Sequence, residues 1–110
     1  MVCVNMNLYC KIFVNTDSDY SQFFNSLFSF LNGKKLAVSF IVSDWCSISI
    51  SRNKEYTENS TDFLYWKYFI DVDSETSDEV LYIKRIRELV NFLKQNYSGA
   101  VCACDFEELL

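Results

Sequence analysis

The feature that most constrains the fold is an apolar stripe at helical spacing in residues 20–31. Its members fall at positions i, i+3, i+4, i+7, i+8 and i+11, and they are Tyr20, Phe23, Phe24, Leu27, Phe28 and Leu31. This spacing places them on one face of an α-helix, and that face must be buried against another layer. Residues 15–19 supply short oxygen-bearing side chains that can cap the helix start, and Asn32-Gly33 follows its end. The sequence therefore predicts a helix from about residue 20 to residue 31.

Strand patterns lie on both sides of this helix. Residues 8–14 alternate before it, and residues 46–51 alternate without interruption, which is typical of a strand with one solvated face. Residues 36–42 form a nearly continuous apolar run, which predicts a strand covered on both faces. We expect the 36–42 and 46–51 strands to pair as a hairpin. Residues 52–62 are polar and charged, which is typical of a loop.

A longer strand is predicted for residues 63–72. One face would carry Leu64, Trp66, Tyr68, Ile70 and Val72, and Tyr65 and Phe69 would share the other.

A second helix and a last short strand complete the pattern. Thr76 and Glu79 stand three apart, which matches a capping box at the start of the helix. Gly99 is expected to end the helix, and residues 100–104 then form the strand. The predicted buried stripe of the helix is Val80, Ile83, Ile86, Val90, Leu93 and Tyr97, flanked by Leu89.

The predicted element order is β-α-β-β-β-α-β in a single domain that spans residues 1–110. Helices that alternate with an antiparallel hairpin indicate an α+β two-layer sandwich. We expect a five-stranded, mostly antiparallel sheet with both helices on one face, a variant of the ferredoxin-like arrangement. The second sheet face would then be partly open, with aromatic side chains on it.

The absence of histidine from all 110 residues narrows the function classes. Ser-His, Cys-His and His-metal chemistry are excluded within this chain. With only Gly33 and Gly99, the chain has no phosphate-binding glycine loop. Pairs of carboxylates are common, but a domain of this size rarely offers the deep cleft that glycosidase chemistry needs. We therefore predict that the protein is not an enzyme.

Cysteine usage indicates a reducing compartment. The five cysteines, Cys3, Cys10, Cys46, Cys102 and Cys104, form an odd set without a disulfide-like spacing. Cys102 and Cys104 have the only metal-like spacing, but a closed zinc site needs four ligands, so we interpret them as small buried side chains and predict neither metal nor cofactor. With no secretory leader and no long apolar run, we expect a cytoplasmic protein that does not enter the membrane.

A formal net charge of −5 points to a protein partner rather than to nucleic acid, whose backbone normally binds clustered Lys and Arg. Complementary potentials speed the encounter with a basic protein. The simpler alternative is that the charge only keeps a small domain soluble. The aromatic run at residues 65–69 resembles a base-stacking platform, but the charges next to it are acidic.

The acidic composition and the ending Ala103-Cys104-Asp105-Phe106-Glu107-Glu108-Leu109 resemble the bacterial immunity proteins of polymorphic toxin systems, including contact-dependent growth inhibition. Those proteins share no single fold. The resemblance implies a protein that binds and neutralises a cognate toxin domain, often a basic nuclease. Because contacts differ for each toxin, it assigns no residues.

We infer the contact residues from charge and expected exposure instead. They are the carboxylates where the 63–72 strand ends, the second helix begins and the last strand ends, with two aromatic anchors: Asp71, Asp73, Glu75, Asp105, Glu107, Glu108, Tyr65 and Phe69. Two other classes stay open. A phage-type inhibitor or nucleic-acid mimic predicts carboxylates spaced like phosphates along one face. A small-ligand regulatory domain predicts an apolar pocket with a few converging polar groups.

Overall fold

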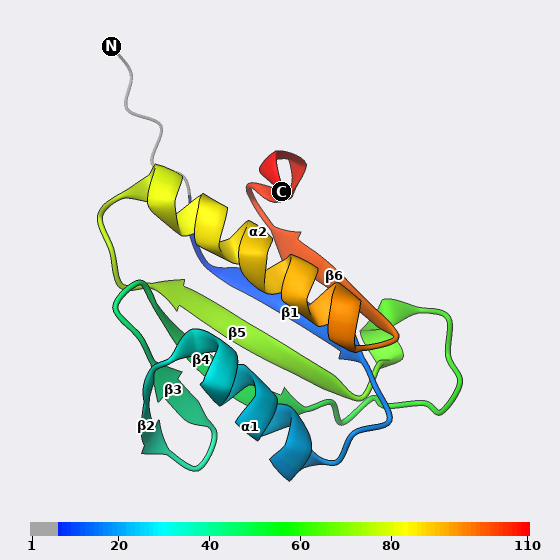
Figure 1. Cartoon of the computed structure of the whole chain (residues 1–110). Helices are drawn as coiled ribbons and strands as arrows, with labels where there is room; N and C mark the ends of the chain where they lie inside the picture. Colours follow the sequence, from blue (N-terminus) through cyan, green and yellow to red (C-terminus); the bar gives the residue numbers. More distant parts are fainter. Residues whose placement is uncertain (1–6) are drawn as a thin grey trace.

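Six strands form one antiparallel sheet in the computed structural model, which describes residues 7–110 (Figure 1). The strand order across the sheet is β2-β3-β4-β5-β1-β6, and every neighbouring pair is antiparallel. The strands are β1 (Cys10–Asn15), β2 (Lys34–Ala37), β3 (Phe40–Val42), β4 (Cys46–Arg52), β5 (Tyr68–Ser74) and β6 (Gly99–Cys104). The α+β class and the antiparallel sheet match the prediction, but the sheet has six strands rather than five.

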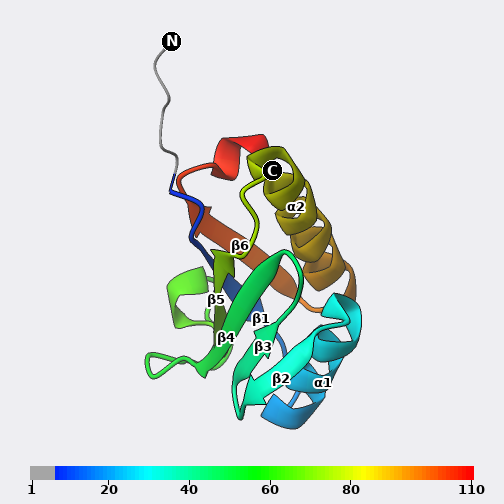
Figure 2. The same ribbon diagram turned by 90° about the vertical axis from the view of Figure 1, so that its left-hand side faces the viewer.

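Both helices cover the same face of the sheet, and the view turned by 90° shows them together on one side (Figure 2). They are α1 (Tyr20–Leu31) and α2 (Glu79–Asn96). The predicted bounds of α1 are confirmed. Asp19 caps its start in a capping box with Gln22, and Asn32 ends it in the left-handed conformation with φ 51°. Asn32 therefore takes the role that the sequence pattern assigned to Asn32-Gly33 together.

Helix α2 differs from its prediction at its start, at its end and in its buried stripe. It ends at Asn96, and Gly99, which was expected to end it, is the first residue of β6. Its cap is Asp78, whose carboxylate accepts a hydrogen bond from the backbone N–H of Leu81, and not Thr76. Val80 is 80% exposed, and Tyr82 is fully buried in its place. Successive residues turn a helix by about 100°, so Val80 lies on nearly the opposite side of the helix from Tyr82 and points away from the core. The buried residues of α2 are Tyr82, Ile86, Leu89, Val90 and Leu93.

The core lies between the helices and alternate residues of the strands. Ile12 of β1 pairs with Ile70 of β5, and Ile70 pairs with Ile50 of β4, so a buried row crosses the sheet. Phe23 of α1 stacks on Tyr68 with ring centroids 4.8 Å apart. This alternation assigns the intervening residues to the opposite surface, which we call the helix-free face.

The apolar run at residues 36–42 is not one covered strand, so that prediction was wrong. It turns at residues 38–39 and forms β2 and β3, at the outer edge of the sheet. Leu36 is 67% exposed and Val38 is 77% exposed, because nothing in the described residues packs over this hairpin tip. The predicted pairing with the 46–51 segment is confirmed, since β3 is antiparallel to β4.

The segment before β5 is also corrected. Residues 63–65 form a short 3-10 helix, η1 (Phe63–Tyr65), instead of the first part of a strand. The Asn53 amide donates hydrogen bonds to the carbonyls of Leu64 and Trp66, which holds this segment folded back. Phe63 contacts Phe13 with centroids 5.2 Å apart, and so η1 covers part of the helix-free face.

None of the helices in the part of the chain that the structure describes is long and apolar enough to cross a membrane.

Candidate functional site

Most of the predicted contact carboxylates lie at one end of the sheet. Strands β5 and β6 are both antiparallel to β1, so they run in the same direction and end together. Cys10 of β1 pairs with Val72 of β5 on one side and with Cys104 of β6 on the other. The last residues of β5 and β6 therefore lie at the same level, on the two sides of β1. The carboxylates at these strand ends are exposed, and we call them the acidic end: Asp73, Glu75, Asp105, Glu107 and Glu108.

The turn before β4 adds a further carboxylate to the acidic end. The N–H of Glu75 donates to the carbonyl of Trp45, which brings the turn at residues 43–45 beside it. Asp44 in that turn is exposed. Asp44 was not predicted as a contact residue, because only the strand register places it there.

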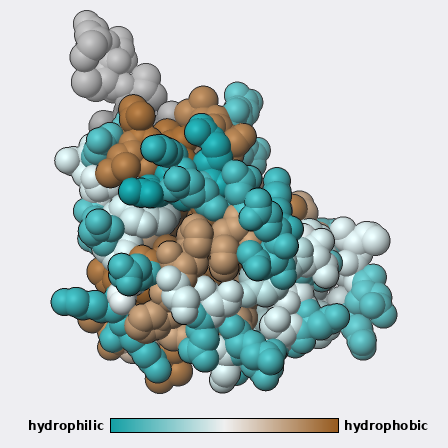
Figure 3. Space-filling model, viewed as in Figure 1, coloured by the Kyte–Doolittle hydropathy of each residue, from teal (hydrophilic) through white to brown (hydrophobic). Residues whose placement is uncertain are grey.

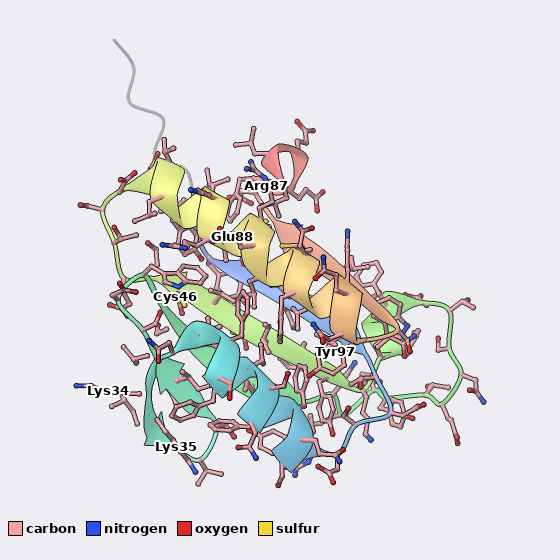
Figure 4. The ribbon with its side chains drawn as sticks, in the orientation of Figure 1. Lys34, Lys35, Cys46, Arg87, Glu88 and Tyr97 are labelled. Carbon is pink, nitrogen blue, oxygen red and sulfur yellow. The ribbon has the colours of Figure 1, made fainter. Side chains whose placement is uncertain are left out.

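The carboxylates of the acidic end are not engaged within the protein. Among residues 7–110, the one ion pair joins Arg85 to Glu88, and no hydrogen bond involves the side chains of the acidic end. The Arg87 guanidinium reaches the C-terminal segment, but it donates to the carbonyl of Leu109 at 2.7 Å and not to a carboxylate (Figure 4). The negative charge therefore faces solvent, where a cationic partner can reach it.

Asp71 and Phe69 lie on the helix-free face of β5, Asp71 next to the acidic end and Phe69 near the start of the strand. Both are half-buried and both have contacts within the protein. The Tyr9 hydroxyl donates a hydrogen bond to the Asp71 carboxylate. Burial is the larger cause of the raised pKa of Tyr9, and this hydrogen bond adds to it. The ammonium of Lys11 lies 4.1 Å from the centre of the Phe69 ring. Asp71 and Phe69 are therefore less available than the residues of the acidic end.

Tyr65 is not brought together with the other predicted residues. It belongs to η1, which precedes β5, whereas the acidic end follows β5. The seven residues of β5 separate the two by about 20 Å. Tyr65 also shares no strand face with Phe69, so the predicted aromatic pair does not form. Two exposed apolar side chains, Val80 and Leu109, flank the acidic end instead.

A second feature is a cluster of three cysteines on β1 and β6, and the sequence indicated only two of them. Cys10, Cys102 and Cys104 point to the helix-bearing side of the sheet, and their sulfur atoms all lie within 4.8 Å of one another. The sequence spacing had paired Cys102 with Cys104 only. Strand pairing brings in Cys10 from 92 residues away, and spacing along the chain gives no signal of this. Cys3 lies outside the described residues.

The three thiols differ in their affinity for a proton. The hydrogen bond with Cys102, together with burial, raises the pKa of Cys10, and the same bond lowers the pKa of Cys102. Burial raises the pKa of Cys104 to about 11. Cys46, away from this cluster on β4, has its pKa raised to about 12 by burial. Cys102 is thus the sulfur that ionises first in the cluster.

A cavity of about 390 Å³ lies between α2 and β6 and reaches this cluster. Cys102 contributes to its wall, together with Arg87, Lys94 and Glu107. The wall therefore carries a thiol, two cations and one carboxylate, and this mixture can accept an ion or a small polar molecule.

Comparisons with family models, with curated proteins and with solved structures give no match.

Proposed function

We propose that this chain is an immunity protein, which binds and neutralises a basic bacterial toxin domain of the nuclease type through its acidic end. The observation that carries the proposal is the coincidence of two strand ends. Carboxylates from positions far apart in sequence, around residues 73–75 and 105–108, meet at one exposed end without internal partners. This arrangement adds to the resemblance of the C-terminal segment to immunity proteins.

The electrostatic argument favours a basic protein partner. A nuclease needs a positive surface to hold its substrate, and an inhibitor that covers that surface gains speed from opposite charge. Affinity also needs apolar anchors near the centre of the contact. Val80 and Leu109 supply such side chains, and the space-filling view shows apolar surface near the start of α2 (Figure 3). We therefore propose that the contact covers the acidic end with these two anchors and that Asp71 lies at its rim, whereas Phe69 lies further back, near the start of β5.

The fold supports a ferredoxin-like variant as the scaffold. With the β2–β3 hairpin set aside, the order β1-α1-β4-β5-α2-β6 is the β-α-β-β-α-β pattern. We propose that the hairpin is an addition to that scaffold, at the edge of the sheet next to β4.

The proposal is tested with the polypeptide encoded beside this gene. Purified, it is expected to degrade nucleic acid and to lose that activity when one equivalent of this protein is added. The pairs Asp73→Lys with Glu75→Lys and Glu107→Lys with Glu108→Lys should each weaken inhibition at least tenfold. The matched control is Glu55→Lys with Glu58→Lys, which changes net charge equally at the opposite end and should inhibit like wild type. Equal loss in all three variants, or an unaffected partner, contradicts the proposal.

The two alternative functions have unequal support. The carboxylates gather at one end, and β4 presents Ser47, Ser49 and Ser51 to the helix-free face, so no phosphate-like ladder supports a nucleic-acid mimic. The cavity beside α2 supports a small-ligand domain as a second candidate, because its volume lies within the usual range for ligand pockets. A rise in melting temperature with small anionic metabolites, lost in Arg87→Ala, would favour that candidate.

A further inference from the structure

The cluster of Cys10, Cys102 and Cys104 lies on two regularly paired strands at one edge of the sheet. Cys10 pairs with Cys104 across β1 and β6, and Cys102 follows two residues away on the same face. Cys10 and Cys102 have sulfur atoms 2.7 Å apart, and Cys102 and Cys104 have theirs 3.7 Å apart. Because hydrogen-bonded strands position all three residues, the cluster is held by backbone and not by flexible loops.

The separation of the Cys102 and Cys104 sulfur atoms, 3.7 Å, fits a tetrahedral thiolate site. Zinc–sulfur bonds of about 2.3 Å in a tetrahedral site place thiolate sulfurs about 3.8 Å apart. The distance from Cys102 to Cys104 matches this value, and small rotations of Cys10 would bring it to the same distance. The register makes Cys104 the direct partner of Cys10 and Cys102 its diagonal neighbour, and all three sulfur atoms lie within 4.8 Å of one another. One ion can bind all three sulfurs, whereas a disulfide would join two of them and leave the third out.

The burial of the cluster also fits a bound ion. Cys10 is fully buried, while Cys102 and Cys104 are half-buried. Cys102 lines the cavity beside α2, and Glu107 lines the same cavity. An ion held by the three sulfurs would therefore have its fourth position directed to this cavity, where water or the Glu107 carboxylate can complete a tetrahedron.

We propose that Cys10, Cys102 and Cys104 form a binding site for one thiophilic cation of the zinc(II) class. Each thiol that coordinates forms a metal–sulfur bond and releases its proton to solvent. The solvent-accessible Cys102, which lines the cavity, is the first sulfur to bind. Glu107 is the one member of the acidic end that lines the cavity of this site, so loss of the three thiols would leave the proposed toxin contact in place.

The test is titration of the reduced, metal-free protein with zinc, followed by competition with a chromogenic chelator. We expect one equivalent to bind with a dissociation constant of about 1 μM or tighter. Cobalt(II) bound in its place should give thiolate-to-metal charge-transfer absorption. Zinc should also raise the melting temperature of the wild-type protein, and a chelator should reverse the rise.

The variants separate this site from the other cysteines. Cys102→Ser and Cys104→Ser change half-buried positions, and each should weaken zinc binding at least about 100-fold. Cys46→Ser, at a buried free cysteine two strands from β1, is the matched control and should bind like wild type. A double variant, Cys3→Ser with Cys46→Ser, keeps only the three sulfurs of the site and should still bind one equivalent.

Three results would overturn the proposal. The first is absence of stoichiometric zinc uptake by the reduced wild-type protein. The second is zinc affinity equal to that of the wild type in folded Cys102→Ser, or loss of zinc binding in the Cys3→Ser with Cys46→Ser variant. The third is a protein two hydrogens lighter, with a peptide that links Cys10 to Cys102 or to Cys104, together with no zinc uptake after reduction. That last result would identify a disulfide pair in place of a metal site.

Discussion

The two ends of the sheet use the same kind of residue in different ways. At the end where β5 begins, carboxylates hold the backbone: Asp19 accepts from the N–H of Gln22, and Asp62 accepts from the N–H of Leu64. Near the acidic end, Asp78 caps α2 in the same way, but the carboxylates of Asp73 and Glu75, which follow a strand end, accept no hydrogen bond within the described residues. A carboxylate at a helix start stabilises the fold, whereas one that follows a strand end is free for a partner. Stability thus rests on the capping carboxylates and not on those of the acidic end.

The largest expected effect concerns the residue that fixes the end opposite the acidic one. The Trp66 indole donates to the carbonyl of Ser60, and its ring contacts Gly99, where a Cβ would lie 2.9 Å from the ring. Trp66→Ala should lower the free energy of unfolding by about 3 kcal/mol, because a large apolar contact is lost. Urea denaturation measures this. Leu64→Ala, at a half-exposed side chain two residues away, should cost under about 1 kcal/mol. Similar losses in both variants would show that Trp66 has no special role.

The second effect tests the structural carboxylates. Asp19→Ala removes the cap of α1 and its reciprocal bond with Gln22, and it should lower the free energy of unfolding by about 1 kcal/mol. Asp17→Ala removes an exposed carboxylate without such a bond and should change it by less than about 0.5 kcal/mol. If the two variants are equally stable in urea, the capping box contributes nothing and the comparison between the ends fails.

The smallest expected effect on stability lies at the acidic end. Neutralising Asp73, Glu75, Glu107 and Glu108 to their amides should leave the free energy of unfolding within about 0.5 kcal/mol of wild type, because no internal bond is broken. Thermal and urea unfolding both report on this. A loss well above about 1 kcal/mol would mean that these carboxylates support the fold and are not reserved for a partner.

The sequence predicted the parts of the fold that periodicity controls. The bounds of α1, the strand that precedes it and the alternation of residues 46–51 follow from apolar spacing, because each buries one face against the core. The errors lie where local contacts override that spacing. Residues 63–65 are apolar enough for a strand, but two side chains hold them as η1. The Asn53 amide donates a hydrogen bond to the carbonyl of Leu64, and the Asp62 carboxylate accepts one from the N–H of Leu64.

The candidate site was predictable to the same degree. The ends of β5 and β6 could be located from the apolar patterns of the two strands. The carboxylates of the acidic end, which follow these strand ends, could therefore be inferred from the sequence. Tyr65 was misplaced because its strand begins later than the pattern indicates, at Tyr68. Cys10 was missed as a neighbour of Cys102 and Cys104 because the pairing of β1 with β6 joins the first and last strands. Long-range register of this kind is not encoded in residue spacing.

The acidic end is tested most directly by its rate of association with the polypeptide encoded beside this gene, measured by stopped flow over a range of salt concentrations. Attraction between opposite charges raises the association rate and is screened by salt. We expect a steep fall in the wild-type rate as salt increases. We also expect a slower and nearly salt-independent rate for Asp73→Lys with Glu75→Lys. The same rate and the same salt response in both proteins would contradict a role for the acidic end in recognition.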